Sequence, residues 1–203
     1  MTIRKGEEWG SHGSLPAGGV VVRSDAEARA AVERARRAND AVPALGLLGG
    51  DLCRTLGGQG DEARLHGPDA LVAPVDLGAV LVDGRLHWFV AHLVVRRGWL
   101  RGPILAAMNA QLLGEWDVAP RSHPNDGLLD TFVVTMPVGE RLKARRRLRT
   151  GTHVPHAGIE QRRVAAVQWD VPPGAHVWLD GQDIGTAKTV SVRVEPDAIT
   201  CVV

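Results

Sequence analysis

Asn125, Asp126 and Asp130 lie in one short segment, Pro124–Asp130, in which Gly127 separates the two carboxylates. The segment comes just before an apolar run that is typical of a strand. An oxygen-rich turn of this kind suits Mg²⁺ or Ca²⁺, because both ions prefer carboxylate and carbonyl oxygens. The same residue types are typical of a polar turn, in which Asn, Asp and Gly satisfy the turn geometry. The residues alone leave both interpretations open.

Two other glycine-bearing segments offer different chemistry. Asp180 precedes Gly181 between two apolar runs, and its carboxylate could act as a general base. A type I′ hairpin turn requires the same Asp-Gly pair. Gly49, Gly50 and Asp51 follow a short apolar run, so their N–H groups could approach a phosphate. This second segment does not identify a nucleotide site, because the chain has neither a Walker A motif nor a full dinucleotide-binding glycine motif.

Histidine and arginine clusters give two further hypotheses. His153 and His156 are three residues apart, a spacing at which two histidines can ligate one metal ion. With no Cys or third His nearby, a hydrogen-bonding loop pair is the alternative. Arg141–Arg149 carries basic side chains at most of its positions. It could contact phosphates or an anionic membrane surface, or form a solvated charged face.

The first part of the chain has the pattern of a small α/β layer. Ser24 and Glu27 form a capping box, and an Ala-, Glu- and Arg-rich segment follows it. Together with the apolar runs around it, this predicts the order strand, helix, strand, helix over Val20–Val22, Asp25–Arg37, Leu45–Leu48 and Leu52–Leu56.

The pattern changes after Pro68, where apolar runs become short and frequent. Asp83-Gly84 and Asp180-Gly181 are strong hairpin signals. We therefore expect an α+β protein, in which a reduced α/β segment at 1–68 precedes a larger antiparallel β-sandwich at 69–203. The cleft between the two units is the default ligand site.

Composition excludes several classes of protein. Of 203 residues, 44% are hydrophobic and 23% charged, with a net charge of +1, which is typical of a globular chain and not of a general nucleic-acid binder. Two cysteines cannot build a disulfide scaffold. No apolar run is long enough for a membrane span, and the first residues lack a signal sequence, so we expect a cytoplasmic protein.

Taken in order, these motifs resemble the diacylglycerol kinase-type lipid kinases, which are grouped with NAD kinases. The resemblance is best in the C-terminal two-thirds, where it rests on Val75–Gly78, Ala119-Pro120, Pro124–Asp130, His153, Asp180-Gly181-Gln182 and Glu195–Ile199. It implies that residues 104–113, helical by propensity, form a strand, because tertiary context overrides propensity.

The N-terminal third is similar to the family more loosely. Leu45–Gly57 resembles its second glycine-containing segment, and Arg23–Glu27 stands where the family has a glycine-rich loop. Only Asp25 matches within that loop. The family also begins with a further nucleotide-binding strand that this chain does not match, so the chain resembles a shortened and divergent member.

The resemblance implies transfer of the γ-phosphoryl group of ATP to a diacylglycerol-like lipid hydroxyl, with Mg²⁺ as cofactor. Asp180, with Gly181 in its turn, would be the base. Asn125, Asp126 and Asp130 would hold the metal. The residues implied at the ATP phosphates are Asp25, Gly49, Gly50, Asp51 and Arg54.

Departures from the family pattern keep two alternatives open. Arg23, Ser24 and Ala26 replace loop glycines, and Gln182 replaces an acid. The first alternative is a degenerate, non-catalytic module that binds a lipid or a partner. The second is a binder of anionic surfaces or nucleic acid through Arg141–Arg149, with nucleic acid the less expected.

The resemblance also bears on partners and localisation. An N-terminal strand is missing, so a sheet edge would be exposed unless Ile3–Trp9, a second copy or a partner chain covers it. We expect a cytoplasmic protein that can be peripheral to a membrane.

Overall fold

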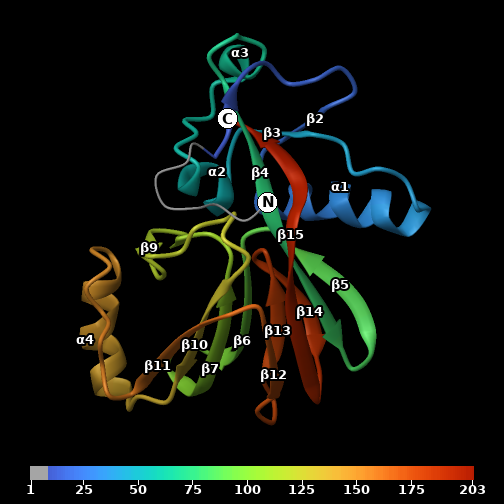
Figure 1. Ribbon diagram of the computed structural model, residues 1–203. Helices are drawn as coiled ribbons and strands as arrows, with labels where there is room; N and C mark the ends of the chain where they lie inside the picture. The colour runs from blue at the N-terminus through green and yellow to red at the C-terminus, as the bar shows by residue number, and fades with distance from the viewer. Residues whose placement is uncertain (1–8) are drawn as a thin grey trace.

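In the computed structural model, which describes residues 9–203, a small α/β layer sits above a β-sandwich (Figure 1). The α/β layer contains two parallel strands, β2 (Val20–Val22) and β3 (Leu45–Leu47). Three helices accompany them: α1 (Asp25–Ala38), α2 (Asp51–Thr55) and α3 (Glu62–Leu65). The predicted order of strand, helix, strand and helix is therefore confirmed.

Two long strands join the layers. β4 (Leu71–Val82) and β15 (Thr189–Val202) pair antiparallel along most of their length. The end of β15 also pairs in parallel with β3, where Cys201 lies opposite Leu45. The sheet order is β1-β4-β15-β3-β2, and β5 (Arg85–Phe89) and β12 (Ala166–Asp170) extend its sandwich end. The short strand β1 is Ser11–His12.

The second sheet of the sandwich has six antiparallel strands in the order β11-β10-β7-β6-β13-β14. Their bounds are β6 (His92–Gly98), β7 (Arg101–Met108), β10 (Leu129–Val134), β11 (Ile159–Val164), β13 (His176–Leu179) and β14 (Gln182–Thr186). Successive side chains in a strand point to opposite faces. Leu93 and Val95 therefore enter the core between the sheets, whereas Val94 belongs to an apolar cluster on the outer face.

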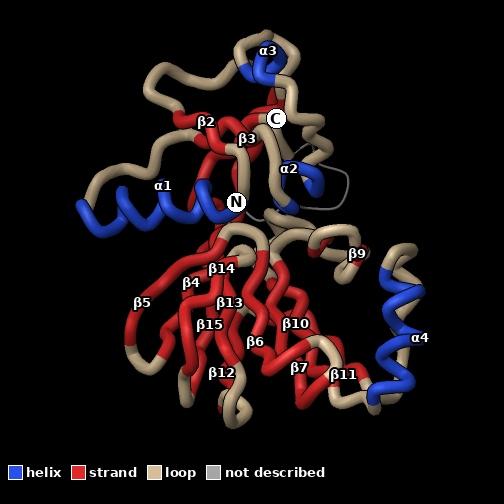
Figure 2. The backbone as a smooth tube through the Cα atoms, turned by 180° about the vertical axis from the view of Figure 1, so that it is seen from behind, coloured by secondary structure: helices blue, strands red, loops and turns tan. Residues whose placement is uncertain are grey.

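That outer face is covered by α4 (Val138–Leu148), which stands beside the sheet in both views (Figures 1 and 2). The small hairpin of β8 (Leu112–Leu113) and β9 (Trp116–Asp117) lies at one end of α4. Leu113 and Val118 from this region join the outer-face cluster. The second sheet thus has an apolar cluster on each face.

Several local predictions are confirmed. Asp83-Gly84 and Asp180-Gly181 both have the two positive φ angles of a type I′ turn, with φ of 48° at Asp180 and 80° at Gly181. Residues 104–108 lie in β7, so tertiary pairing overrides helix propensity there. The strand expected over 104–113 is interrupted, because Asn109 and Ala110 leave it and donate N–H groups to the Ala91 carbonyl.

The expected α+β class and its β-sandwich are confirmed. β2 ends the path of the larger sheet, pairs only with β3 among the described residues, and leaves Val20 exposed. Of the expected cover Ile3–Trp9, the part before Trp9 lies outside the described residues. Across residues 9–203, no helix has both the length and the apolar character needed to cross a membrane.

Candidate functional site

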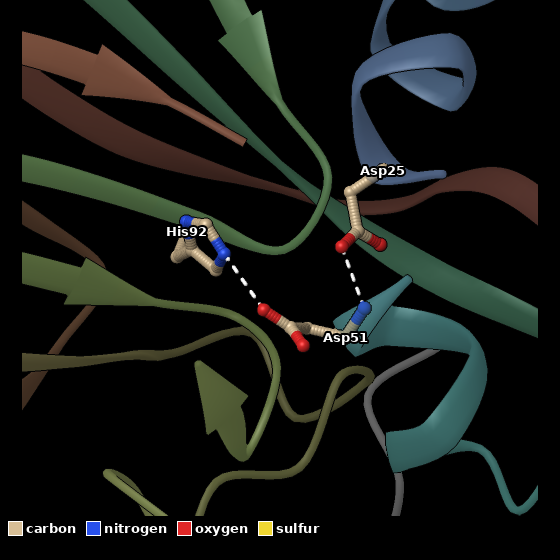
Figure 3. A group of neighbouring side chains, drawn as sticks. All are labelled: Asp25, Asp51 and His92. Atoms are coloured by element: carbon tan, nitrogen blue, oxygen red, sulfur yellow. Dashed lines mark hydrogen bonds and ion pairs between the residues drawn. The ribbon is translucent and has the colours of Figure 1, made fainter. Parts of the chain in front are cut away.

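Asp25 connects the first turns of two helices. Its position is fixed by the predicted capping box: the Ser24 hydroxyl accepts the Glu27 N–H at 3.2 Å, and the Glu27 carboxylate accepts the Arg23 N–H at 2.8 Å. The Asp25 carboxylate turns away from α1 and accepts the N–H groups of Asp51 at 2.6 Å and Leu52 at 3.0 Å (Figure 3). Burial raises the pKa of Asp25, although these two bonds oppose the rise.

Asp51, the first residue of α2, faces His92 of β6 (Figure 3). The Nε2 atom of His92 lies 3.0 Å from its carboxylate, and the Gly114 N–H donates to it at 3.0 Å. Arg54 also donates to it from within α2. Burial alone would raise the pKa of Asp51, but these donors lower it. Burial alone would lower the pKa of His92, but its bond to Asp51 and the nearby carboxylates of Asp180 and Asp25 outweigh burial and raise it.

Asp180 lies at the tip of the β13–β14 turn, with its carboxylate pointing into the protein. That carboxylate accepts three backbone N–H groups, from Val90 at 3.0 Å, Ala91 at 2.9 Å and His92 at 3.1 Å. Its side chain has 0% exposure, and the Nε atom of Arg29 lies 3.9 Å away. Burial raises the pKa of Asp180 to about 6. The structure therefore places Asp180 in the same cluster as Asp25 and Asp51, but its carboxylate oxygens already accept the N–H groups of residues 90–92.

The other residue predicted as catalytic, Gly181, and the remaining predicted nucleotide-site residues lie around this cluster. Gly181 is the second residue of the turn, with nothing near the position of a Cβ. Gly49 and Gly50 pack tightly, since a Cβ on Gly49 would lie 2.5 Å from the Arg23 carbonyl oxygen and one on Gly50 would collide with Asp25. Arg54 also donates to the Gly114 carbonyl and so joins α2 to the β8–β9 hairpin.

The predicted metal ligands lie in a different place: Asn125 and Asp126 are in the loop before β10, and Asp130 is the second residue of β10. The Asn125 amide donates to Asp197 at 2.7 Å. Asp126 forms an ion pair with Arg163, and Asp130 accepts a bond from Gln161 at 3.1 Å. These side chains hold their own loop to β11 and to the bulge in β15. Whether they also bind a metal stays a prediction.

Asp76 of β4 binds the loop that precedes β10, and its burial predicts how the free energy of unfolding depends on pH. It is buried, and it accepts the N–H groups of Gly127 at 2.7 Å and Asp197 at 2.9 Å. Burial raises its pKa from 3.8 to about 6. The folded state therefore binds the proton more tightly than the unfolded state, and the contribution of Asp76 to the free energy of unfolding is greatest below pH about 4. It falls between pH about 4 and 6, by at most about 3 kcal/mol at about 1.4 kcal/mol per pKa unit, and is constant above.

Urea unfolding of the wild type and Asp76→Asn between pH about 4 and 7 measures this contribution. The free energy of the wild type minus that of the variant should decrease as the pH rises to about 6. A pH-independent difference would contradict the prediction. The exposed Asp69→Asn is the matched control.

A cavity of about 600 Å³ lies between α4 and the outer face of the second sheet. Its walls are almost entirely apolar and include Val94, Ile104, Ala106, Phe132, Val134 and Met136 from the sheet and Ala144 and Leu148 from α4. Trp99, Leu100 and Trp116 also line it. We call it the α4 cavity.

Of the polar side chains that line the α4 cavity, Arg141 and His153 differ in how their polar atoms are satisfied. The Arg141 guanidinium donates hydrogen bonds to three backbone carbonyls, those of Met136 at 2.8 Å, Trp99 at 3.1 Å and Gly102. His153 is 4% exposed, and neither ring nitrogen makes a hydrogen bond within the described chain. Burial lowers its pKa, against the opposing effects of Asp117 and the Val118 backbone. A buried imidazole with both nitrogens unpartnered is costly unless something else satisfies it.

Comparison with known proteins agrees with this architecture. Residues 79–203 match the model of the YegS C-terminal NAD kinase beta sandwich-like domain. The chain belongs to this family. The resemblance to diacylglycerol kinase-type lipid kinases is thereby confirmed, and the matched region is the sandwich that carries the α4 cavity. No curated protein matches the chain significantly.

Solved structures support the same fold. Three structures named for a diacylglycerol kinase of Bacillus anthracis str. Sterne superpose with TM-scores of 0.60, 0.56 and 0.52. Their sequence identities are 15%, 15% and 16%. In each comparison 79% of this chain is covered, against 69%, 69% and 66% of the other chain. At this identity the likeness is one of fold.

The residues of this family member do not fit the phosphates of ATP. Phosphate binding at a helix N-terminus needs unpartnered N–H groups. Here the Ser24 hydroxyl accepts the Glu27 N–H at the start of α1, and Asp25 accepts the Asp51 and Leu52 N–H groups at the start of α2. The carboxylates of Asp25 and Glu27 would also repel a phosphate.

Mg²⁺ fits poorly at the same place. Within residues 9–203, one group of three His, Cys, Asp or Glu side chains has potential ligand atoms that all lie within 4.8 Å of one another. It consists of Asp25, Asp51 and His92. Mg²⁺ prefers an octahedron of oxygens, whereas this group includes an imidazole and its carboxylates already accept N–H bonds. A cation here would also have to displace Arg54 from Asp51.

Sequence reasoning missed His92, Arg29 and the α4 cavity. His92 is one of two histidines, with His87, inside the otherwise apolar run of residues 86–95, and that placement was the available signal. The proposed His153–His156 metal pair is not supported by their positions, since His153 lines the α4 cavity whereas His156 accepts the Gly158 N–H at 3.0 Å. The cavity has no sequence signal, because it depends on the spacing between α4 and the sheet.

Proposed function

We propose that this chain binds a lipid, with the hydrocarbon in the α4 cavity, and does not by itself transfer phosphate to it. The observation that carries the proposal is the cavity, whose volume of about 600 Å³ is within the range of small-molecule sites. Its apolar walls give a hydrocarbon chain the favourable transfer out of water that such a ligand needs.

His153 limits the chemical class of the lipid. Because burial lowers its pKa, the ring is neutral near pH 7 and carries one donor and one acceptor nitrogen. A hydroxyl group can accept from the donor nitrogen or donate to the acceptor nitrogen, and an ester oxygen can accept from the donor nitrogen. We therefore propose a neutral lipid alcohol or acylated glycerol whose oxygen contacts His153.

Two observations favour binding over phosphoryl transfer. A general base has to reach the proton it removes, but the Asp180 side chain has 0% exposure and accepts three backbone N–H groups. At the helix N-termini that would hold phosphates, the N–H groups of Glu27, Asp51 and Leu52 already donate to Ser24 or Asp25. Family membership is the reason to retain catalysis as the competing hypothesis.

The test compares lipid binding by the purified chain and by Ala106→Trp. Ala106 lines the α4 cavity, so the indole should fill it and weaken binding of a monoacylglycerol at least about tenfold, measured by native mass spectrometry and by displacement of a fluorescent lipid. Ala166→Trp, at an exposed position of β12, is the matched control and should bind normally. His153→Leu should still bind hydrocarbon but lose most of its preference for lipids with a hydroxyl group, since the polar partner is gone.

Equal binding by the wild type and Ala106→Trp would overturn the lipid-binding proposal. Calorimetry with Mg²⁺-ATP tests the non-catalytic part, and we expect no binding at about millimolar nucleotide. Micromolar binding that weakens in Asp126→Ala would favour the kinase hypothesis instead.

A further inference from the structure

Exposed apolar side chains gather beside the α4 cavity. The large hydrophobic residues exposed within residues 9–203 are Val20, Leu81, Leu86, Trp99, Leu100, Val138 and Leu142. Trp99 and Leu100 form the β6–β7 turn, and Val138 and Leu142 lie one turn apart on the outer side of α4. Arg141 binds the Trp99 carbonyl at 3.1 Å, and the Trp99 ring packs edge-on against Trp116, over which Arg145 lies, so the turn adjoins α4. Single exposed hydrophobic residues are ordinary, but a contiguous group marks an interaction site.

The helix α4 is also strongly basic. Arg145, Arg146 and Arg147 are exposed and have no ion pair within the described part of the chain. Arg145 lies over the Trp116 ring at 5.7 Å, at the wall of the α4 cavity. Lys143 is paired with Glu140, the one acid among residues 138–149.

We propose that this surface docks on an anionic lipid bilayer. The docking surface comprises Trp99, Leu100, Val138, Leu142 and Arg145–Arg147. An interfacial helix inserts apolar side chains beneath the headgroups while basic side chains bind the phosphates, and α4 offers both kinds of side chain on exposed positions. Nucleic acid would use the arginines but would leave the four exposed apolar side chains in water.

The position of the surface adds a functional consequence that rests on the proposed lipid-binding function. Trp99, Leu100 and Arg145 belong both to the docking surface and to the lining of the α4 cavity. Docking would therefore place the cavity against the bilayer from which its lipid comes. The docking itself depends only on the exposed side chains.

Co-sedimentation of the full chain with vesicles tests the docking. The vesicles are phosphatidylcholine, alone or with about 30% phosphatidylserine, at about 0.05 and 0.5 M NaCl. We expect at least about tenfold tighter binding to the anionic vesicles, weakened by salt. Arg145→Gln/Arg146→Gln/Arg147→Gln should reduce it at least about tenfold, and Leu142→Ser at least about threefold at both salt concentrations. The matched control is Arg34→Gln/Arg37→Gln on the exposed side of α1, which should bind as the wild type does.

Each other outcome overturns the docking proposal. Binding that ignores phosphatidylserine, or that survives loss of the three arginines, would exclude this surface. Binding that depends on the arginines but not on Leu142, together with equally tight binding to a single-stranded RNA, would assign the patch to nucleic acid. Ala106→Trp, which fills the α4 cavity, should still bind vesicles, so that failure of the lipid-binding proposal and failure of the docking proposal are distinguishable.

Discussion

Replacing Asp180 with alanine is expected to lower the free energy of unfolding by about 3–5 kcal/mol, the range found when one partner of a buried charge network is removed. Three N–H groups, of Val90, Ala91 and His92, lose their acceptor in a region that water does not reach. The nearly buried Arg29 guanidinium loses a carboxylate 3.9 Å away. Asp180→Asn keeps one acceptor oxygen and should cost about 1–3 kcal/mol.

Urea unfolding followed by circular dichroism measures both variants of Asp180. The control is Asp170→Ala, an exposed carboxylate at the end of β12, which should change the free energy by about 0.5 kcal/mol or less. A fully stable Asp180→Ala would mean that the carboxylate does not hold the β5–β6 loop. A catalytic base would then again be a reasonable role for it.

Arg141→Met is expected to lower the free energy of unfolding by about 2–4 kcal/mol and to loosen the wall of the α4 cavity. Methionine keeps the apolar stem but leaves the carbonyls of Met136, Trp99 and Gly102 without their donor. The cost of burying the guanidinium, which lowers its pKa, is relieved and offsets part of this loss. The β6–β7 turn would then be held to α4 mainly by side-chain packing.

Hydrogen exchange distinguishes this local loosening from a general loss of stability. Amides of residues 98–102 and of the start of α4 should exchange faster in Arg141→Met, beyond the change in global stability. Arg146→Met, on the exposed side of the same helix, should leave both exchange and stability within about 0.5 kcal/mol of the wild type. Identical exchange in the two variants would show that Arg141 does not hold the turn.

Local chemistry explains which parts of the fold could be predicted from the sequence. The Asp83-Gly84 and Asp180-Gly181 pairs predicted their hairpins, because few other residue pairs accept two positive φ angles. The Ser24–Glu27 capping box likewise predicted where α1 begins. β7 was predictable only through the family resemblance, since its Leu-Ala-Ala-Met sequence favours a helix and only pairing with β6 and β10 makes it a strand.

The candidate site was less predictable, because its interactions join residues far apart in the chain. The sequence indicated that Asp180 occupies a turn, but not that its carboxylate points inward to the N–H groups of Val90 and Ala91. Gly49 and Gly50 were interpreted as a phosphate cradle, whereas the structure shows that they make room for Arg23 and Asp25. A glycine that permits close approach does not reveal what approaches.

The pairing of β3 with β15 has a consequence for folding during synthesis at the ribosome. Leu45 of β3 is synthesised long before Cys201 of β15, with which it pairs. Contacts this distant in sequence close slowly and expose apolar edges until they form. The α/β layer therefore stays incomplete until β15 has been synthesised and pairs with β3. Until then its unpaired strand edges are exposed to aggregation.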